Sequence, residues 1–162
     1  MRIAVRNTLS VIFIFFSTLV VADFDKGMTA YNSSDYATAI KEFSVAAEQG
    51  HAKAQYNLGT MYDFGNGVPE DDSKAVKWYR KAAEQGYANA QYNLGVMYAK
   101  GEGVPENYIK AYMWVSLAAA FGYKDEKKAK EVLKKRMSSE QIAEAQRLSS
   151  EWFEKYSQKN QN

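Results

Sequence analysis

Apolar residues recur at helical spacing in two neighbouring stretches of the chain. In residues 54–62, Ala54, Leu58 and Met61 stand at positions i, i+4 and i+7, which places them on one face of a helix. Residues 75–83 repeat this spacing with large aromatic residues set among alanines. The pattern predicts two helices that pack on each other by fitting aromatic rings against small side chains.

A glycine-rich loop separates these two predicted helices. Gly65 and Gly67 tolerate a positive φ, and Pro69 prevents the first helix from continuing. Asp71 can accept hydrogen bonds from the free N–H groups that begin the second helix. We therefore interpret the loop as a turn with a helix cap. A phosphate cradle is disfavoured, because that motif follows a strand and this loop follows a predicted helix.

The whole pattern occurs twice, with a shift of 36 residues. Residues 51–86 align with residues 87–122, and residues 35–50 align with the second half of each unit. The identical pairs include Leu58/Leu94, Gly59/Gly95, Gly65/Gly101, Gly67/Gly103, Pro69/Pro105 and Trp78/Trp114. Gly50, Gly86 and Gly122 end the second helices as predicted left-handed caps. A fixed period in the mid-thirties indicates a stacked solenoid.

These residues resemble a known family. The pattern A-x-Y-x-L-G-x-x-Y-x-x-G-x-G-V-P-x-x-x-x-K-A-x-x-W-Y-x-x-A-A-x-Q-G is similar to the Sel1-like repeat, a relative of the tetratricopeptide repeat. The resemblance implies an all-α, right-handed α-solenoid of about four helix-turn-helix pairs. The expected organisation is a signal peptide (1–22), an N-terminal tetratricopeptide-like capping repeat (23–50), two Sel1-like repeats (51–86 and 87–122) and C-terminal capping helices with a frayed tail (123–162).

The expected signal peptide has a basic start and an apolar middle. Arg2 and Arg6 precede an apolar run over residues 9–22 that ends in small residues. We expect cleavage after Ala22 and a periplasmic or secreted protein, with a retained anchor as the alternative. Without these residues the chain has 19 basic and 19 acidic side chains, and it has no cysteine. The charge therefore gives no indication of nucleic acid as a partner, and no stable membrane insertion is expected after cleavage.

Candidate catalytic and metal-binding residues are scarce. His51 is the single histidine of the sequence, and no serine precedes a lysine by three positions, the spacing found in β-lactam-binding enzymes. The acidic run at residues 70–72 lacks the alternate spacing of a calcium loop. We predict no catalytic residue, no metal site and no cofactor. The family resemblance implies a non-catalytic adaptor or scaffold, and a β-lactam-binding or hydrolase-type enzyme is a competing hypothesis.

The predicted partner surface is the concave side of the stack. In tetratricopeptide-like units the first helix of each pair lines that side, and a protein or peptide would bind there. The corresponding residues are Lys53, Tyr56, Asn57, Thr60, Asp63, Phe64, Asn89, Tyr92, Asn93, Val96 and Lys100. The asparagines could clamp a peptide backbone, whereas the alternative is that the tyrosines and asparagines only connect neighbouring helices. Specificity is predicted at the positions that differ between the copies, which are Thr60/Val96, Asp63/Ala99 and Phe64/Lys100.

The C-terminal part of the chain contains a basic segment and an exposed apolar surface. The basic segment Lys124 to Arg136 is interpreted as an amphipathic helix with a solvated face, and a dock for anionic lipid or acidic partners is the alternative. Leu117 and Phe121 replace the polar residues Lys81 and Gln85 of the preceding unit, and a helix that starts at Ser138 is expected to cover them. A monomer follows. The alternative is a dimer, or a structural subunit of an envelope machine that makes contact through this apolar end.

Overall fold

The computed structural model describes residues 23–161, in which the chain forms eight α-helices. The expected signal peptide, residues 1–22, lies outside the described residues. The helices are α1 (Phe24–Asn32), α2 (Tyr36–Glu48), α3 (Ala52–Asp63), α4 (Asp72–Glu84), α5 (Ala88–Lys100), α6 (Tyr108–Ala120), α7 (Glu126–Lys134) and α8 (Ser139–Lys159).

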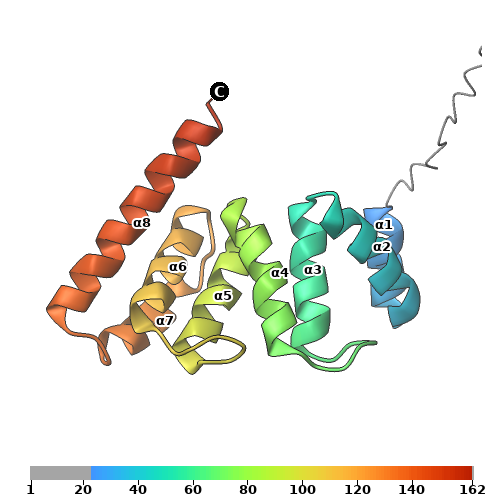
Figure 1. Ribbon diagram of the computed structural model, residues 1–162, viewed down its shortest axis with the longest axis horizontal. Coiled ribbons are helices and arrows are strands. Elements are labelled where there is room, and N and C mark those ends of the chain that lie inside the picture. The colour runs from blue at the N-terminus through green and yellow to red at the C-terminus, as the bar shows by residue number, and fades with distance from the viewer. Residues whose placement is uncertain (1–22, 162) are drawn as a thin grey trace, which may run out of the picture.

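The helices follow one another along the stack in chain order (Figure 1). Each of the helices α1 to α6 packs on the next helix in the chain, and α6 packs against both α7 and α8. The long helix α8 lies across the end of the stack. The prediction of an all-α fold of successively packed helices is confirmed, although the last two helices, α7 and α8, pack mainly on α6 and not on each other.

The glycine loops have the local geometry that the sequence indicates. Gly65 and Gly67 have φ values of 65° and 74°, in the left-handed region that residues with a side chain rarely adopt. The Asp71 side chain accepts a hydrogen bond of 2.9 Å from the Lys74 N–H and caps α4. Asn107 caps α6 in the same way. The loops therefore serve to reverse the chain and to begin the next helix.

Three glycines allow the two helices of a pair to approach closely. The contacts join Gly27 to Phe43, Gly59 to Tyr79 and Gly95 to Val115. A Cβ atom on any of these glycines would lie 2.7 or 2.8 Å from the facing side chain, well inside the contact distance of about 3.5–4.0 Å between carbon atoms. The second helix of each pair thus packs directly on the backbone of the first. The packed residue is aromatic in the first two pairs and a valine in the third.

Buried glutamines connect successive pairs. Gln55 donates from Nε2 to the Ala47 carbonyl at 3.0 Å, and its Oε1 accepts from Gln85 Nε2 at 2.7 Å. Gln91 repeats the first contact, with Ala83, but its buried Oε1 has no hydrogen-bond partner. The cause is visible in the sequence, because position 121 holds a phenylalanine where the preceding unit holds Gln85.

Helix α8 covers the apolar face of α6. Ser138 and Gln141 form the expected capping box at its start. The ring of Trp152 contacts both Trp114 and Phe121, with centroid distances of 5.8 and 5.9 Å, and Leu117 is only 2% exposed. The Tyr156 hydroxyl donates to the Gln85 carbonyl at 3.1 Å. α8 therefore fastens the last pair to the one before it.

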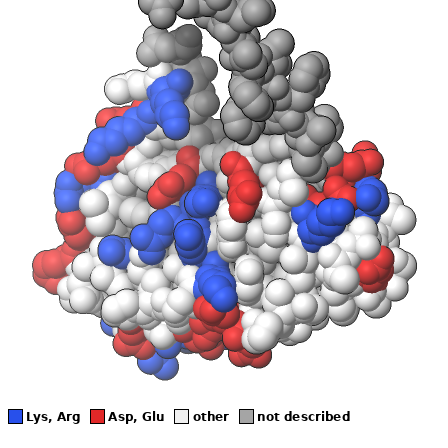
Figure 2. All heavy atoms as spheres, turned by 45° about the vertical axis from the view of Figure 1, so that its right-hand side comes forward, with Lys and Arg blue, Asp and Glu red and all other residues white. Residues whose placement is uncertain are grey.

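The described surface carries both signs of charge. Figure 2 shows basic and acidic side chains interspersed with wide uncharged areas on one face. None of the helices within residues 23–161 combines the length and apolar character that crossing a membrane requires.

Candidate functional site

The residues predicted to line the concave side lie along α3 and α5 and in the turn after α3. We call them the α3–α5 face. Lys53, Phe64, Asn89 and Lys100 are exposed, whereas Tyr56, Asn57, Thr60, Asp63, Tyr92, Asn93 and Val96 are partly buried. Phe64 has the largest exposed fraction of any large hydrophobic residue described, at 66%.

The two tyrosines of this face pack between units. The Tyr56 ring lies 5.2 Å, centroid to centroid, from that of Tyr87, at the start of the next unit. Tyr92 stacks on Tyr123 at 4.2 Å in the corresponding place one unit later. Aromatic pairs of this kind stabilise by about 0.5–1.5 kcal/mol beyond their buried area. The two tyrosines therefore pack neighbouring units together, whether or not they also contact a partner.

The two asparagines are partly engaged within the protein. Asn57 donates from Nδ2 to Met28 Sδ at 3.1 Å, which connects α3 to α1. Asn93 interacts with the Tyr79 hydroxyl, which reaches this face from α4, and opposes the rise in the pKa of Tyr79. Each amide has two donors and an acceptor with two lone pairs, so both asparagines keep capacity for a ligand.

Tyr79 is the centre of a polar cluster on the second unit. Its hydroxyl donates to Asp63 Oδ2 at 2.9 Å and lies 3.3 Å from Thr60 Oγ1. Burial raises the pKa of Tyr79 well above its ordinary value, which keeps the hydroxyl a donor. Burial also raises the pKa of Asp63, and the Tyr79 hydrogen bond acts in the opposite direction. The cluster fills the space between α3 and α4 and closes this part of the face.

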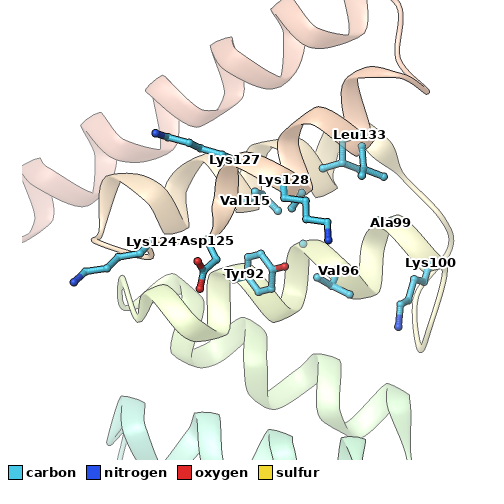
Figure 3. A pocket seen from close by; sticks show the side chains of 13 residues that line it. Tyr92, Val96, Ala99, Lys100, Val115, Lys124, Asp125, Lys127, Lys128 and Leu133 are labelled. Atoms are coloured by element: carbon cyan, nitrogen blue, oxygen red, sulfur yellow. The ribbon is translucent and has the colours of Figure 1, made fainter.

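The third unit replaces every member of that cluster by an apolar residue. Val96, Ala99 and Val115 stand where the second unit has Thr60, Asp63 and Tyr79. Without the tyrosine ring, a pocket of about 790 Å³ opens between α5 and α7 (Figure 3). The pocket is lined by Tyr92, Gly95, Val96, Ala99, Lys100, Val115, Lys124, Asp125, Lys127, Lys128, Ala129, Val132 and Leu133.

The lining combines an apolar floor with a basic rim. Val96 and Tyr92 of α5 face Leu133 and Lys128 of α7 across the pocket, and Lys128 reaches toward Val96 (Figure 3). Val132 contributes an apolar side chain that is 53% exposed.

Four lysines and one carboxylate line the pocket. Lys100 forms an exposed ion pair with Glu102 at 3.3 Å. Lys124, Lys127 and Lys128 form no ion pair with any residue between 23 and 161. The pocket thus offers apolar contact area with an excess of positive charge around it.

The structure brings three predicted residues into this pocket, namely Tyr92, Val96 and Lys100. Lys53, Tyr56, Asn57, Thr60, Asp63, Phe64, Asn89 and Asn93 lie outside its lining. Val115 was not among the residues predicted to form a site. The signal was present in the alignment of the two copies, where Trp78-Tyr79 matches Trp114-Val115. The basic segment Lys124 to Arg136 stood out in the sequence as an alternative dock for acidic partners, but its position as the second wall of this pocket was not predicted, because α7 belongs to neither complete copy.

A second, smaller hollow of about 370 Å³ lies between α6 and α8. It is lined by Ser116, Leu117, Ala120, Ser149, Ser150, Phe153 and Glu154. Phe153 remains 44% exposed there. This is the apolar end that the sequence offers as an alternative contact surface.

His51 has a structural role. Its Nδ1 accepts a hydrogen bond of 3.3 Å from the Ala54 N–H and so caps α3, and its ring lies 4.8 Å from that of Phe24. Across residues 23–161, no group of three or more His, Cys, Asp or Glu side chains is arranged to hold a metal ion.

Comparisons with known proteins agree with the repeat geometry. The Sel1 repeat family model matches residues 52–87 and 88–123, one residue later than the units aligned above. One similar structure is the crystal structure of c5321, a protective antigen present in uropathogenic Escherichia coli strains that displays an SLR fold. It is 33% identical to this chain at a TM-score of 0.73, and the match covers 80% of this chain and 29% of that one.

A second structure matches over most of its own length. The Sel1 repeat protein from Oxalobacter formigenes is 37% identical at a TM-score of 0.62, and the match covers 67% of this chain and 84% of that one. Among curated proteins, an uncharacterized protein of Neisseria meningitidis serogroup B is 59% identical over 34 residues, which are 21% of this chain and 7% of that protein. The chain thus spans only a small part of that curated relative. The repeats, the fold and these matches together show that the chain belongs to the Sel1 repeat family.

Proposed function

We propose that this chain is a non-catalytic adaptor or scaffold that binds a protein or peptide on its α3–α5 face, in the periplasm or outside a bacterial cell. Export is inferred from the basic and apolar pattern of residues 1–22. A non-catalytic role is supported by the family and by the cap that His51 provides, which accounts for the single histidine without chemistry. Fold alone does not decide function, so the function is inferred from the residues of the site.

The observation that carries the proposal is the pocket between α5 and α7. Its volume of about 790 Å³ falls in the range of about 300–1,000 Å³ that ligand-binding pockets have. The pocket opens where the third unit lacks the polar cluster that closes the second unit. It is therefore specific to the third unit and is not a feature of every repeat. On the same α3–α5 face, Asn57 and Asn93 retain hydrogen-bonding capacity for a peptide backbone.

Site-specific photocrosslinking in intact cells tests this function. A photoreactive amino acid is placed at Lys53, Asn89 or Lys100 on the α3–α5 face and, as a matched control, at Lys77 or Glu84. All five positions are exposed. We expect one discrete adduct from the first three positions and none from the two on α4. Adducts from α4 alone would contradict the assigned face.

The second candidate function is that of a structural subunit that makes contact through the α6–α8 hollow. The exposed ring of Phe153 and the hollow beside Leu117 favour it. The discriminating variant is Phe153→Glu, which adds charge at this hollow and leaves the α3–α5 face unchanged. Loss of the adduct at Lys100 in this variant would favour the second candidate.

A further inference from the structure

We propose that the pocket between α5 and α7 takes one apolar side chain of a partner segment whose flanking residues are acidic. This inference rests on the proposed function and specifies the chemistry of the partner. Its two parts follow from the floor and from the rim of the same pocket, and the occupant is a peptide segment of another protein.

The floor selects for an apolar group. Val96, Ala99, Val115, Val132 and Leu133 supply aliphatic surface, and the polar residues that occupy the matching volume in the second unit are absent. A ligand group that displaces water from this surface gains about 25 cal/mol per Å² of apolar area buried. A polar side chain would lose hydrogen bonds to water there and find no partner on the floor.

The rim selects for negative charge. Lys127 and Lys128 come from the start of α7 and Lys124 from the turn before it, and none of the three has an ion-pair partner among the described residues. Lys100 lines the pocket from the end of α5, where it is paired with Glu102. Asp125 is the one acidic residue of the lining, so the local charge is positive although residues 23–161 carry equal numbers of basic and acidic side chains. Complementary charge of this kind sets specificity and association rate.

The surroundings of the pocket favour a peptide over an acyl chain. At one end, the stack of Tyr92 on Tyr123 bounds the apolar floor. The α3–α5 face also carries the polar side chains of Asn93 and Asp63, both partly buried, and Asp63 lies close enough to Lys100 of the lining to interact with it electrostatically. An extended peptide alternates its side chains and can place a backbone amide against such a surface. An acyl chain would have to lie on it without any hydrogen bond.

The test uses the full chain and synthetic peptides that are blocked at both ends. The probe is fluorescently labelled Gly-Asp-Glu-Leu-Glu-Asp-Gly, and binding is followed by fluorescence anisotropy. One comparison peptide replaces the leucine by serine, and another replaces the acids by lysines. Burying a leucine side chain contributes about 1.5–3 kcal/mol, so we expect the serine peptide to bind at least about tenfold more weakly. The lysine peptide should not bind measurably, and binding of the probe should weaken with added salt.

Two sets of variants test whether the peptide binds in the pocket. Lys100→Glu with Lys128→Glu reverses charge at the rim, and Lys77→Glu with Lys135→Glu makes the same change in net charge at exposed positions outside the lining. We expect at least about tenfold weaker binding from the first pair, equivalent to 1.4 kcal/mol, and less than about twofold change from the second. Both pairs lie on the surface, so folding is retained.

The second set fills the pocket with the residues that the second unit has at the matching positions. Val96→Thr, Ala99→Asp and Val115→Tyr together rebuild the cluster of Thr60, Asp63 and Tyr79. This variant should remain helical and lose binding of the leucine peptide.

The possible results separate the inference from the function on which it rests. Equal binding of the leucine and serine peptides, or no effect of rim reversal, would overturn the inference. Crosslinks from Lys53 and Asn89 would in that case still support partner binding on the α3–α5 face. Binding only to vesicles of phosphatidylglycerol and phosphatidylcholine, with no peptide bound, would also overturn it and would assign the rim to an anionic lipid surface.

Discussion

Tyr79 packs directly on Gly59, where a Cβ atom would lie 2.7 Å from Cδ1 of the ring. The tyrosine is buried at 0% exposure, yet its hydroxyl reaches the polar cluster on the α3–α5 face. The same contact in the next unit joins Gly95 to Val115, and the shorter side chain leaves the pocket open. The residue that packs on the glycine, together with the residues at positions 96 and 99, therefore distinguishes the open third unit from the closed second unit.

Gly59→Ala should destabilise the protein. The added methyl group overlaps the Tyr79 ring, and overpacking of this kind costs about 1–3 kcal/mol, which exceeds the gain of about 1 kcal/mol from replacing a helical glycine. Urea unfolding followed by circular dichroism measures the change. Lys77→Ala, on the exposed side of α4, is the control and should be nearly neutral. A Gly59→Ala variant as stable as the wild type would show that the contact is loose.

Trp152→Ala should weaken the end of the stack. Trp152 contacts Trp114, Phe121 and Tyr156 and is half-buried, so we expect a loss of about 2–3 kcal/mol, below the ~3–5 kcal/mol of fully buried aromatic residues. The neighbouring Phe153→Ala is the matched control. Its ring is 44% exposed, and it should cost about 1 kcal/mol or less. Equal losses from the two variants would contradict the role assigned to α8 as the cover of α6.

The raised pKa of Asp63 predicts a pH dependence of stability. Burial favours the protonated carboxyl in the folded state, so the folded protein binds more protons than the unfolded chain just above the ordinary value of 3.8. Stability relative to Asp63→Asn should therefore fall as the pH rises from about 3.8 through the folded-state pKa, then level off. Urea unfolding of both proteins across this range measures the difference.

Asp71→Asn provides a control of opposite sign. The backbone N–H of Lys74 donates to Asp71 and holds the pKa of that carboxyl below its ordinary value. The contribution of Asp71 is present above the unfolded-state pKa and is lost as the pH falls through the folded-state value. The two variants should diverge from the wild type in opposite directions. Parallel curves would show that neither carboxyl behaves as its surroundings indicate.

Much of the fold could be predicted because its determinants are local and repeated. The caps at Asp71, Asn107 and Ser138 depend on side chains within three residues of the helix they begin. The positive φ of Gly65 and Gly67 recurs in Gly101 and Gly103. The cover of α6 by α8 was predictable as well, since exposed apolar residues at the end of a solenoid require burial.

The pocket could be predicted only in part. Val96 and Ala99 stood out as positions that differ between the copies, and Val96 and Lys100 were among the residues proposed to bind a partner. The opposite wall depends on how far α7 stands from α5, which is a tertiary distance that no local pattern encodes. The unpartnered Oε1 of Gln91 has a different origin that the alignment of the copies contains. Phe121, which packs on Trp152 of α8, replaces the glutamine that donates to Gln55 Oε1 in the preceding unit.

Methyl NMR of the wild-type protein, titrated with the acidic leucine peptide, tests the central claim most directly. The pocket contains methyl groups from both walls, and those of Val96, Ala99 and Val132 report on its occupation. Leu117 and Ala120 report on the α6–α8 hollow. We predict that the peptide shifts the first group of signals and leaves the second unchanged. Shifts confined to Leu117 and Ala120 would contradict the claim that the pocket between α5 and α7 is the binding site.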